Sequence, residues 1–211
     1  MKLQSIAFLL AMCAAVSPAG AANLSYTGQF AYDNDVQLFQ FTVGSLSTVV
    51  LRTWSYGGGV NAAGQTIARG GFDPIMALFN SSGELIGEQD DAAPTCVTVA
   101  KDAVTGACWD IDFSKELAPG SYTASLQQYN NYHAGNNLAD GFAFQDAQYQ
   151  NFRDGFVDDH PNQRNGSWAF DILNVNPAAT MPVDVPEPAS LVLMGAALLG
   201  MVARRRRRKP V

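Results

Sequence analysis

Short segments of alternating apolar and polar residues recur between residues 24 and 175. A repeat of two residues is typical of β-strands, whose successive side chains point to opposite faces of a sheet. Residues 36–43 show it clearly. Phe39, Phe41 and Val43 share one face, which we expect to point inward. The pattern predicts strands at 24–30, 36–43, 47–56, 74–80, 84–89, 109–113, 122–129 and 167–175.

Turn-forming residues separate these strands. Residues 80–83 (NSSG) join two of them and predict a hairpin. Glycine-rich residues 57–71 predict a loop. Residues 130–166 form a longer irregular segment, for which the alternatives are a functional, a locally structured or a mobile loop. No amphipathic helix is evident within this region. The pattern therefore predicts an all-β fold, an antiparallel β-sandwich of jelly-roll type with long loops.

The two ends of the chain differ from this pattern. Residues 1–21 combine a basic start, an apolar run and a small-residue cleavage site, which predicts a helical secretory signal peptide. The predicted sandwich domain then covers 22–176, and 177–184 forms a linker. The last 27 residues, 185–211, contain a Pro-Glu-Pro triplet, an apolar run at 189–203 and a basic end. We expect the apolar run to be a helix of about 22 Å, which is short for a bilayer core of ~30 Å.

This tail resembles the PEP-CTERM sorting signal of Gram-negative bacteria. The resemblance rests on the order of its three parts: the motif Val185, Pro186, Glu187 and Pro188, the apolar run, and the basic stop Arg204, Arg205, Arg206, Arg207 and Arg208. It implies transient insertion of 189–203 in the inner membrane, processing by an exosortase, and delivery to the cell envelope, the cell surface or the extracellular matrix. The alternative is an ordinary tail anchor that is never cut.

Removing both ends changes the charge of the protein. The whole chain carries −6, whereas residues 22–186 contain six basic and 18 acidic residues, a net charge of −12. An acidic surface of this kind argues against nucleic acid as a partner and is compatible with cation binding.

Two cysteines, Cys96 and Cys108, remain after the signal peptide. An even number of cysteines in an exported chain predicts a disulfide. A zinc site needs more ligands than these cysteines and the two histidines, His133 and His160, offer.

Four carboxylates form the main candidate site. Asp73 starts one strand of the predicted hairpin, and Glu88, Asp90 and Asp91 lie at the end of its partner, so antiparallel pairing brings them together. Clustered carboxylates suit Ca²⁺, which takes 6–8 oxygen ligands. Residues 30–175 also resemble bacterial pre-peptidase C-terminal domains, through the segments GFDPIMALF (71–79), GELI (83–86), DD (90–91) and LAPGSY (117–122). That resemblance implies calcium at Asp73, Asp90 and Asp91. The alternative is that these aspartates are turn and loop residues.

The long loop offers two weaker sites. Asp154, Asp158 and Asp159 with His160 form a second acidic group. Several aromatic residues stand among amides and could stack on sugar rings, but we expect them instead to pack the loop back onto the sheet: Tyr129, Tyr132, Phe142, Phe144, Tyr149, Phe152 and Phe156.

No Gly-x-Ser-x-Gly or His-Glu-x-x-His motif is present, and we expect no enzyme. The sequence thus predicts an exported, exosortase-sorted protein with a structural or adhesive role, in contact with exopolysaccharide. The alternative is a calcium- or carbohydrate-binding module.

Overall fold

The computed structural model describes residues 22–92, 96–144, 151–158 and 162–175. The chain divides into two units, Met1–Ala178 and Ala179–Val211, and every described residue belongs to the first. The predicted signal helix at 1–21, the linker at 177–184 and the hydrophobic helix at 189–203 lie outside the described residues.

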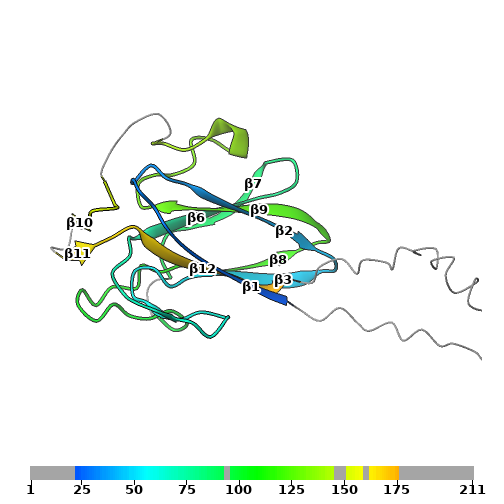
Figure 1. The fold of residues 1–211 in the computed structure, drawn as a ribbon. Helices are drawn as coiled ribbons and strands as arrows, with labels where there is room; N and C mark the ends of the chain where they lie inside the picture. The colour runs from blue at the N-terminus through cyan, green and yellow to red at the C-terminus, as the bar shows by residue number, and fades with distance from the viewer. Residues whose placement is uncertain (1–21, 93–95, 145–150, 159–161, 176–211) are drawn as a thin grey trace, which may run out of the picture. The chain divides into compact units, whose positions relative to one another are not determined.

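Two four-stranded antiparallel sheets face each other (Figure 1). The first has the order β1-β12-β3-β8, in which β1 is Ala22–Gln29, β12 is Ser167–Val175, β3 is Ser47–Thr53 and β8 is Asp112–Leu117. The second has the order β2-β9-β6-β7, in which β2 is Gln37–Val43, β9 is Gly120–Gln128, β6 is Pro74–Phe79 and β7 is Leu85–Gln89.

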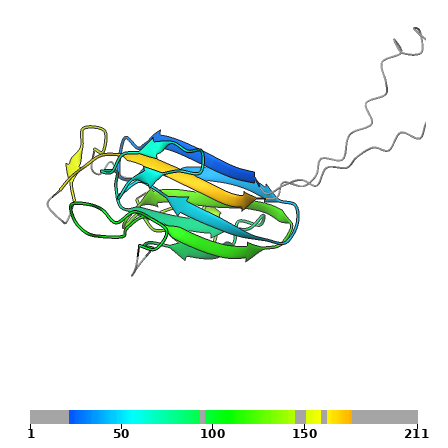
Figure 2. The same cartoon turned by 90° about the horizontal axis from the view of Figure 1, so that it is seen from below.

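The strand order defines the topology. Among these eight strands the first pairs with the last, and the second pairs with the last but one, so the chain wraps around itself. That arrangement is a jelly roll and confirms the predicted fold class. Figure 2, seen from below, shows β12 lying between β1 and β3.

The core lies between the sheets and is rich in aromatic rings. Phe39, Phe41 and Val43 point inward as predicted. Phe39 packs against Phe170 and Trp168 at centroid distances of 4.7 Å and 5.7 Å, so rings from both sheets meet in the middle of the sandwich. The first contact is stacked and the second edge-to-face, and the ring quadrupoles favour offset-stacked and edge-to-face arrangements.

The loops contain more structure than the sequence predicts. The predicted loop 57–71 holds a small ribbon of β4 (Gly59–Val60) and β5 (Thr66–Ile67). The long segment 130–166 contains the 3₁₀ turn η1 (Leu138–Asp140) and a second ribbon of β10 (Phe156–Val157) and β11 (Gln163–Arg164).

One predicted strand is misplaced. The pattern at 109–113 predicts a strand there, but β8 runs from Asp112 to Leu117. The reason is Asp110, whose side chain is fully buried and accepts hydrogen bonds from the Thr53 hydroxyl (2.7 Å) and from the backbone amides of Ser55, Tyr56 and Gly57 (2.6, 3.1 and 2.7 Å). This carboxylate holds the turn after β3, and the regular ladder begins only beyond it.

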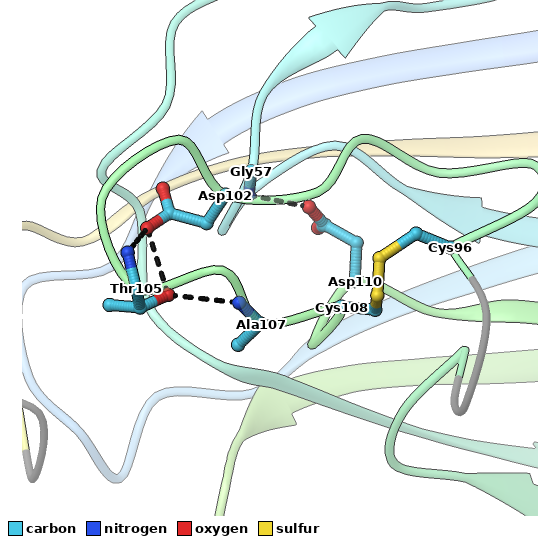
Figure 3. The surroundings of a disulfide bond; sticks show 7 residues. All are labelled: Gly57, Cys96, Asp102, Thr105, Ala107, Cys108 and Asp110. Atoms are coloured by element: carbon cyan, nitrogen blue, oxygen red, sulfur yellow. Dashed lines mark hydrogen bonds between the residues drawn. A yellow bond between two sulfur atoms is a disulfide. The ribbon is translucent and has the colours of Figure 1, made fainter.

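The structure joins Cys96 and Cys108 in the predicted disulfide, with their Cα atoms 5.3 Å apart. Figure 3 shows that the closed loop carries Asp102, which accepts hydrogen bonds from the backbone amide and the hydroxyl of Thr105. Asp110 follows the loop directly, with its bond to Gly57. The disulfide therefore closes a loop that carries one buried carboxylate, Asp102, and ends two residues before another, Asp110.

Replacing both Cys96 and Cys108 with serine should lower the free energy of unfolding by about 3 kcal/mol, the entropy cost of a closed loop of this length. Urea unfolding measures the change. Val97→Ser, a change in the same loop at a side chain that is 81% exposed, is the control and should leave the midpoint unaltered. Equal midpoints for the cysteine variant and the wild type would rule out a stabilising role for the disulfide.

Candidate metal centre and adjoining cavity

Three aspartates meet at one end of the second sheet. Asp73 immediately precedes β6, while Asp90 and Asp91 follow β7. The ladder pairs Met76 with Gln89, which places the start of β6 beside the end of β7. The carbonyl of Asp73 accepts a hydrogen bond from the Tyr129 amide (2.8 Å), and the amide of Ala92 donates to the Asp110 carbonyl (2.9 Å). Both segments are thereby fixed by backbone contacts.

One carboxylate oxygen from each of these residues lies within 4.8 Å of the others, and we call the three the aspartate cluster. Oδ1 of Asp73, of Asp90 and of Asp91 is buried and has no hydrogen-bond partner. An unpaired buried carboxylate oxygen is costly, and three together also repel one another. The fold holds these groups in place despite that cost.

Burial and mutual repulsion also raise the pKa values of the three aspartates. Burial, reinforced by Asp91 and Asp90, raises the pKa of Asp73 to about 9. Burial and the charge of Asp90 raise the pKa of Asp91 to about 6, and burial raises the pKa of Asp90. The cluster therefore favours protons when nothing else neutralises it, and a divalent cation would serve the same purpose better. The oxygen-only donor set fits calcium or magnesium rather than a metal that prefers sulfur or nitrogen.

Glu88 does not join the cluster. Its side chain is about half exposed, and its Oε2 lies 2.6 Å from Nε2 of His133, whose Nδ1 faces the carbonyl of Gly135 at 2.7 Å. The sequence places Glu88 near the end of the strand but gives no sign of its partner. The candidate ligand set is therefore corrected to Asp73, Asp90 and Asp91.

The second predicted acidic group does not come together among the described residues. Asp154 accepts a hydrogen bond from the Asn151 amide group (2.8 Å), whereas Asp158 binds the guanidinium of Arg164 (2.8 Å). Asp159 and His160 lie outside the described residues.

Arg164 is the centre of a buried network that the sequence did not predict. Its side chain is fully buried and donates to Asp158 (2.8 Å), to the Tyr56 carbonyl (3.0 Å) and to Asp102 (3.3 Å). Its guanidinium also lies 3.4 Å from the centroid of the Tyr56 ring. Asp102 additionally pairs with Arg69 at 2.5 Å. Burial alone would raise the pKa of Asp102, but the hydrogen bonds from Arg69 and Thr105 hold it below its usual range.

A cavity of about 550 Å³ adjoins the aspartate cluster. The aspartate cluster, Asp33 and Asp158 form part of its wall, together with Gln128 at the end of β9 and Asn130 beyond it. Aromatic rings form the rest of the wall: Phe72, Trp109, Tyr129, Phe144 and Phe156. Three of these belong to the aromatic residues of the long loop, while Phe142 and Phe152 from the same group are buried and Tyr149 lies outside the described residues. The expected packing is confirmed for Phe142 and Phe152, whereas sugar binding by the rings that line the cavity stays a prediction.

The comparisons with known proteins bear on the tail and on the fold. Residues 184–208 match the family model described as the PEP-CTERM protein-sorting motif. No curated protein matches the chain. Among solved structures, the chain is similar to the pre-peptidase C-terminal domain of a collagenase from Bacillus anthracis, with 11% identity over 71% of this chain and 86% of that one. The TM-score is 0.33, which is too low to assign the fold. The assignment as a jelly roll is based on the strand order described above.

The match at 184–208 confirms the sorting signal expected at 185–211. The protein is therefore an exported one that carries the signal for exosortase processing. Within the part of the chain that the structure describes, no helix has the length and apolar character needed to cross a membrane.

Proposed function

We propose that this chain is a non-catalytic protein of the cell surface or extracellular matrix, whose β-sandwich binds a calcium ion at Asp73, Asp90 and Asp91. The ion ties the start of β6 to the segment after β7, and the module serves a structural or adhesive role. The sorting signal supplies the route to that location, with an exosortase as the processing partner.

One observation carries the calcium proposal. Three carboxylates from two segments converge within 4.8 Å, and each keeps one buried oxygen without a hydrogen-bond partner. An acidic surface loop would turn these oxygens to water, whereas here the fold holds them against one another. Calcium accepts 6–8 oxygen ligands in irregular geometry, so three aspartates with carbonyl or water oxygens would satisfy it.

The expected result is a rise in stability on calcium binding. At a free calcium concentration of 100 times Kd, the free energy of unfolding should increase by about 2.7 kcal/mol, and a chelator should remove the increase. Thermal melting of the purified protein with calcium and with EDTA measures it. Identical melting temperatures in the two conditions would contradict the proposal.

Asp90→Asn locates the ion. This variant should weaken calcium binding at least about tenfold in isothermal titration, because it removes one of the three anionic ligands. Glu116→Gln removes the same charge from an exposed position on β8 and is the matched control. Equal calcium affinities for the two variants would place the ion elsewhere.

A further inference from the structure

The cavity beside the aspartate cluster is much larger than a metal ion requires. A water molecule takes up about 30 Å³ in the liquid, so an ion with a few waters would fill only part of the 550 Å³. Cavities of ~300–1,000 Å³ are typical of sites for small molecules. The size of the cavity therefore indicates an organic ligand next to the ion.

Two aromatic rings of the wall pack against neighbouring rings. Trp109 packs against Tyr56 at a centroid distance of 4.8 Å, and Phe156 lies nearly parallel to Phe152 at 4.1 Å. Tyr129 is 37% exposed. Rings held in this way offer flat apolar faces without losing conformational freedom on binding, and the C–H face of a sugar ring packs well on such a surface.

Polar groups also line the cavity. Oδ2 of Asp158 is fixed by the guanidinium of Arg164 (2.8 Å) and by the Tyr56 hydroxyl (3.1 Å), while its Oδ1 is buried and has no partner. The two contacts of Oδ2 hold the Asp158 carboxylate in place at the cavity wall. The carboxamides of Gln128 and Asn130, which also line the cavity, can both donate and accept. A ligand that carries several hydroxyl groups matches acceptors and donors of this kind.

Charge restricts the ligand further. Five aspartates line the cavity, the aspartate cluster together with Asp33 and Asp158, and no arginine or lysine is among the lining residues, so an anionic ligand would be repelled. Calcium bound by three aspartates has further ligand positions, which two adjacent hydroxyl oxygens can occupy. We propose that the cavity binds a neutral saccharide through adjacent hydroxyl groups, with calcium at the aspartate cluster forming part of the binding surface. This inference rests on the proposed calcium site.

The test is a glycan array probed with the full purified protein, on which neutral and acidic oligosaccharides are printed. In calcium we expect binding to neutral glycans and loss of that binding in EDTA. Tyr129→Ala should weaken binding to the best glycan about tenfold while its calcium affinity in titration stays unchanged. Trp109→Ala is a second variant with the same expectation. Leu38→Ala, at a 43% exposed side chain on β2 that does not line the cavity, is the control.

The outcomes separate the two proposals. Calcium binding without any bound glycan, or glycan binding that persists in EDTA or in both aromatic variants, would overturn the saccharide proposal and leave the calcium site intact. Absence of calcium binding in titration would overturn the proposed function itself.

Discussion

Replacing Arg164 with methionine should lower the free energy of unfolding by about 3–5 kcal/mol. Methionine fills much of the same space, but it cannot donate to Asp158, to Asp102 or to the Tyr56 carbonyl. Two carboxylates would then stay buried with part of their neutralising charge removed. Removing one partner of a buried ion pair destabilises the fold far more than the pair itself stabilises it. The remaining charge stays buried, with neither its partner nor water to compensate it. Urea unfolding followed by tryptophan fluorescence measures the loss.

Two comparisons make this result specific. Arg153→Met removes an equal charge from an exposed position and should change stability by less than about 0.5 kcal/mol. Adding Asp158→Asn to Arg164→Met should restore part of the lost stability, because it removes one of the uncompensated charges. If Arg164→Met and Arg153→Met unfold at the same urea concentration, the network does not stabilise the fold.

The distances along the chain explain why this network was not predictable. Arg164 contacts Asp102 across 62 residues and Tyr56 across 108 residues. No local pattern distinguishes Arg164 from a solvent-exposed arginine in a polar loop. The same holds for Glu88, whose partner His133 lies 45 residues further along the chain. Contacts of this range depend on where the loops fold back, which periodicity does not encode.

The sandwich and the aspartate cluster were predictable for the opposite reason. Alternation of residues such as Phe39, Phe41 and Val43 fixes which face of a strand is buried, and strands of this length between turns give few alternatives to a sandwich. Asp73 and Asp90 belong to one hairpin, so the pairing of Met76 with Gln89 follows from a short turn and brings them together. Alternation did not predict the start of β8 correctly. The buried carboxylate of Asp110 holds the turn after β3, so the strand begins at Asp112 and not at residue 109.

The aspartate cluster should make the stability of the metal-free protein fall as the pH rises. The folded-state pKa values of Asp73, about 9, and of Asp91, about 6, exceed the ordinary value of 3.8. Between pH 3.8 and about pH 9 the folded protein binds more protons than the unfolded chain. Raising the pH through this range therefore lowers the free energy of unfolding. The stabilisation that comes from protonated Asp73 and Asp91 is fully present below about pH 4. It is lost in part as Asp91 titrates near pH 6 and continues to fall up to about pH 9, where Asp73 titrates. Asp102, with its lowered pKa, has the opposite dependence but titrates below this range.

Urea unfolding in EDTA at pH values between about 5 and 9 should therefore show a progressive loss of stability, on the order of a few kcal/mol. Most of it should come from the more deeply buried Asp73, because solvent screens the partly exposed Asp91. Calcium should oppose the loss, and its stabilising effect should grow with pH, because it binds the deprotonated aspartates. Asp73→Asn keeps a neutral side chain at every pH and should flatten the slope in EDTA, whereas Glu116→Gln should leave the slope unchanged. A metal-free protein that becomes more stable between pH 5 and pH 9 would contradict both the buried state of the cluster and its readiness to bind a cation.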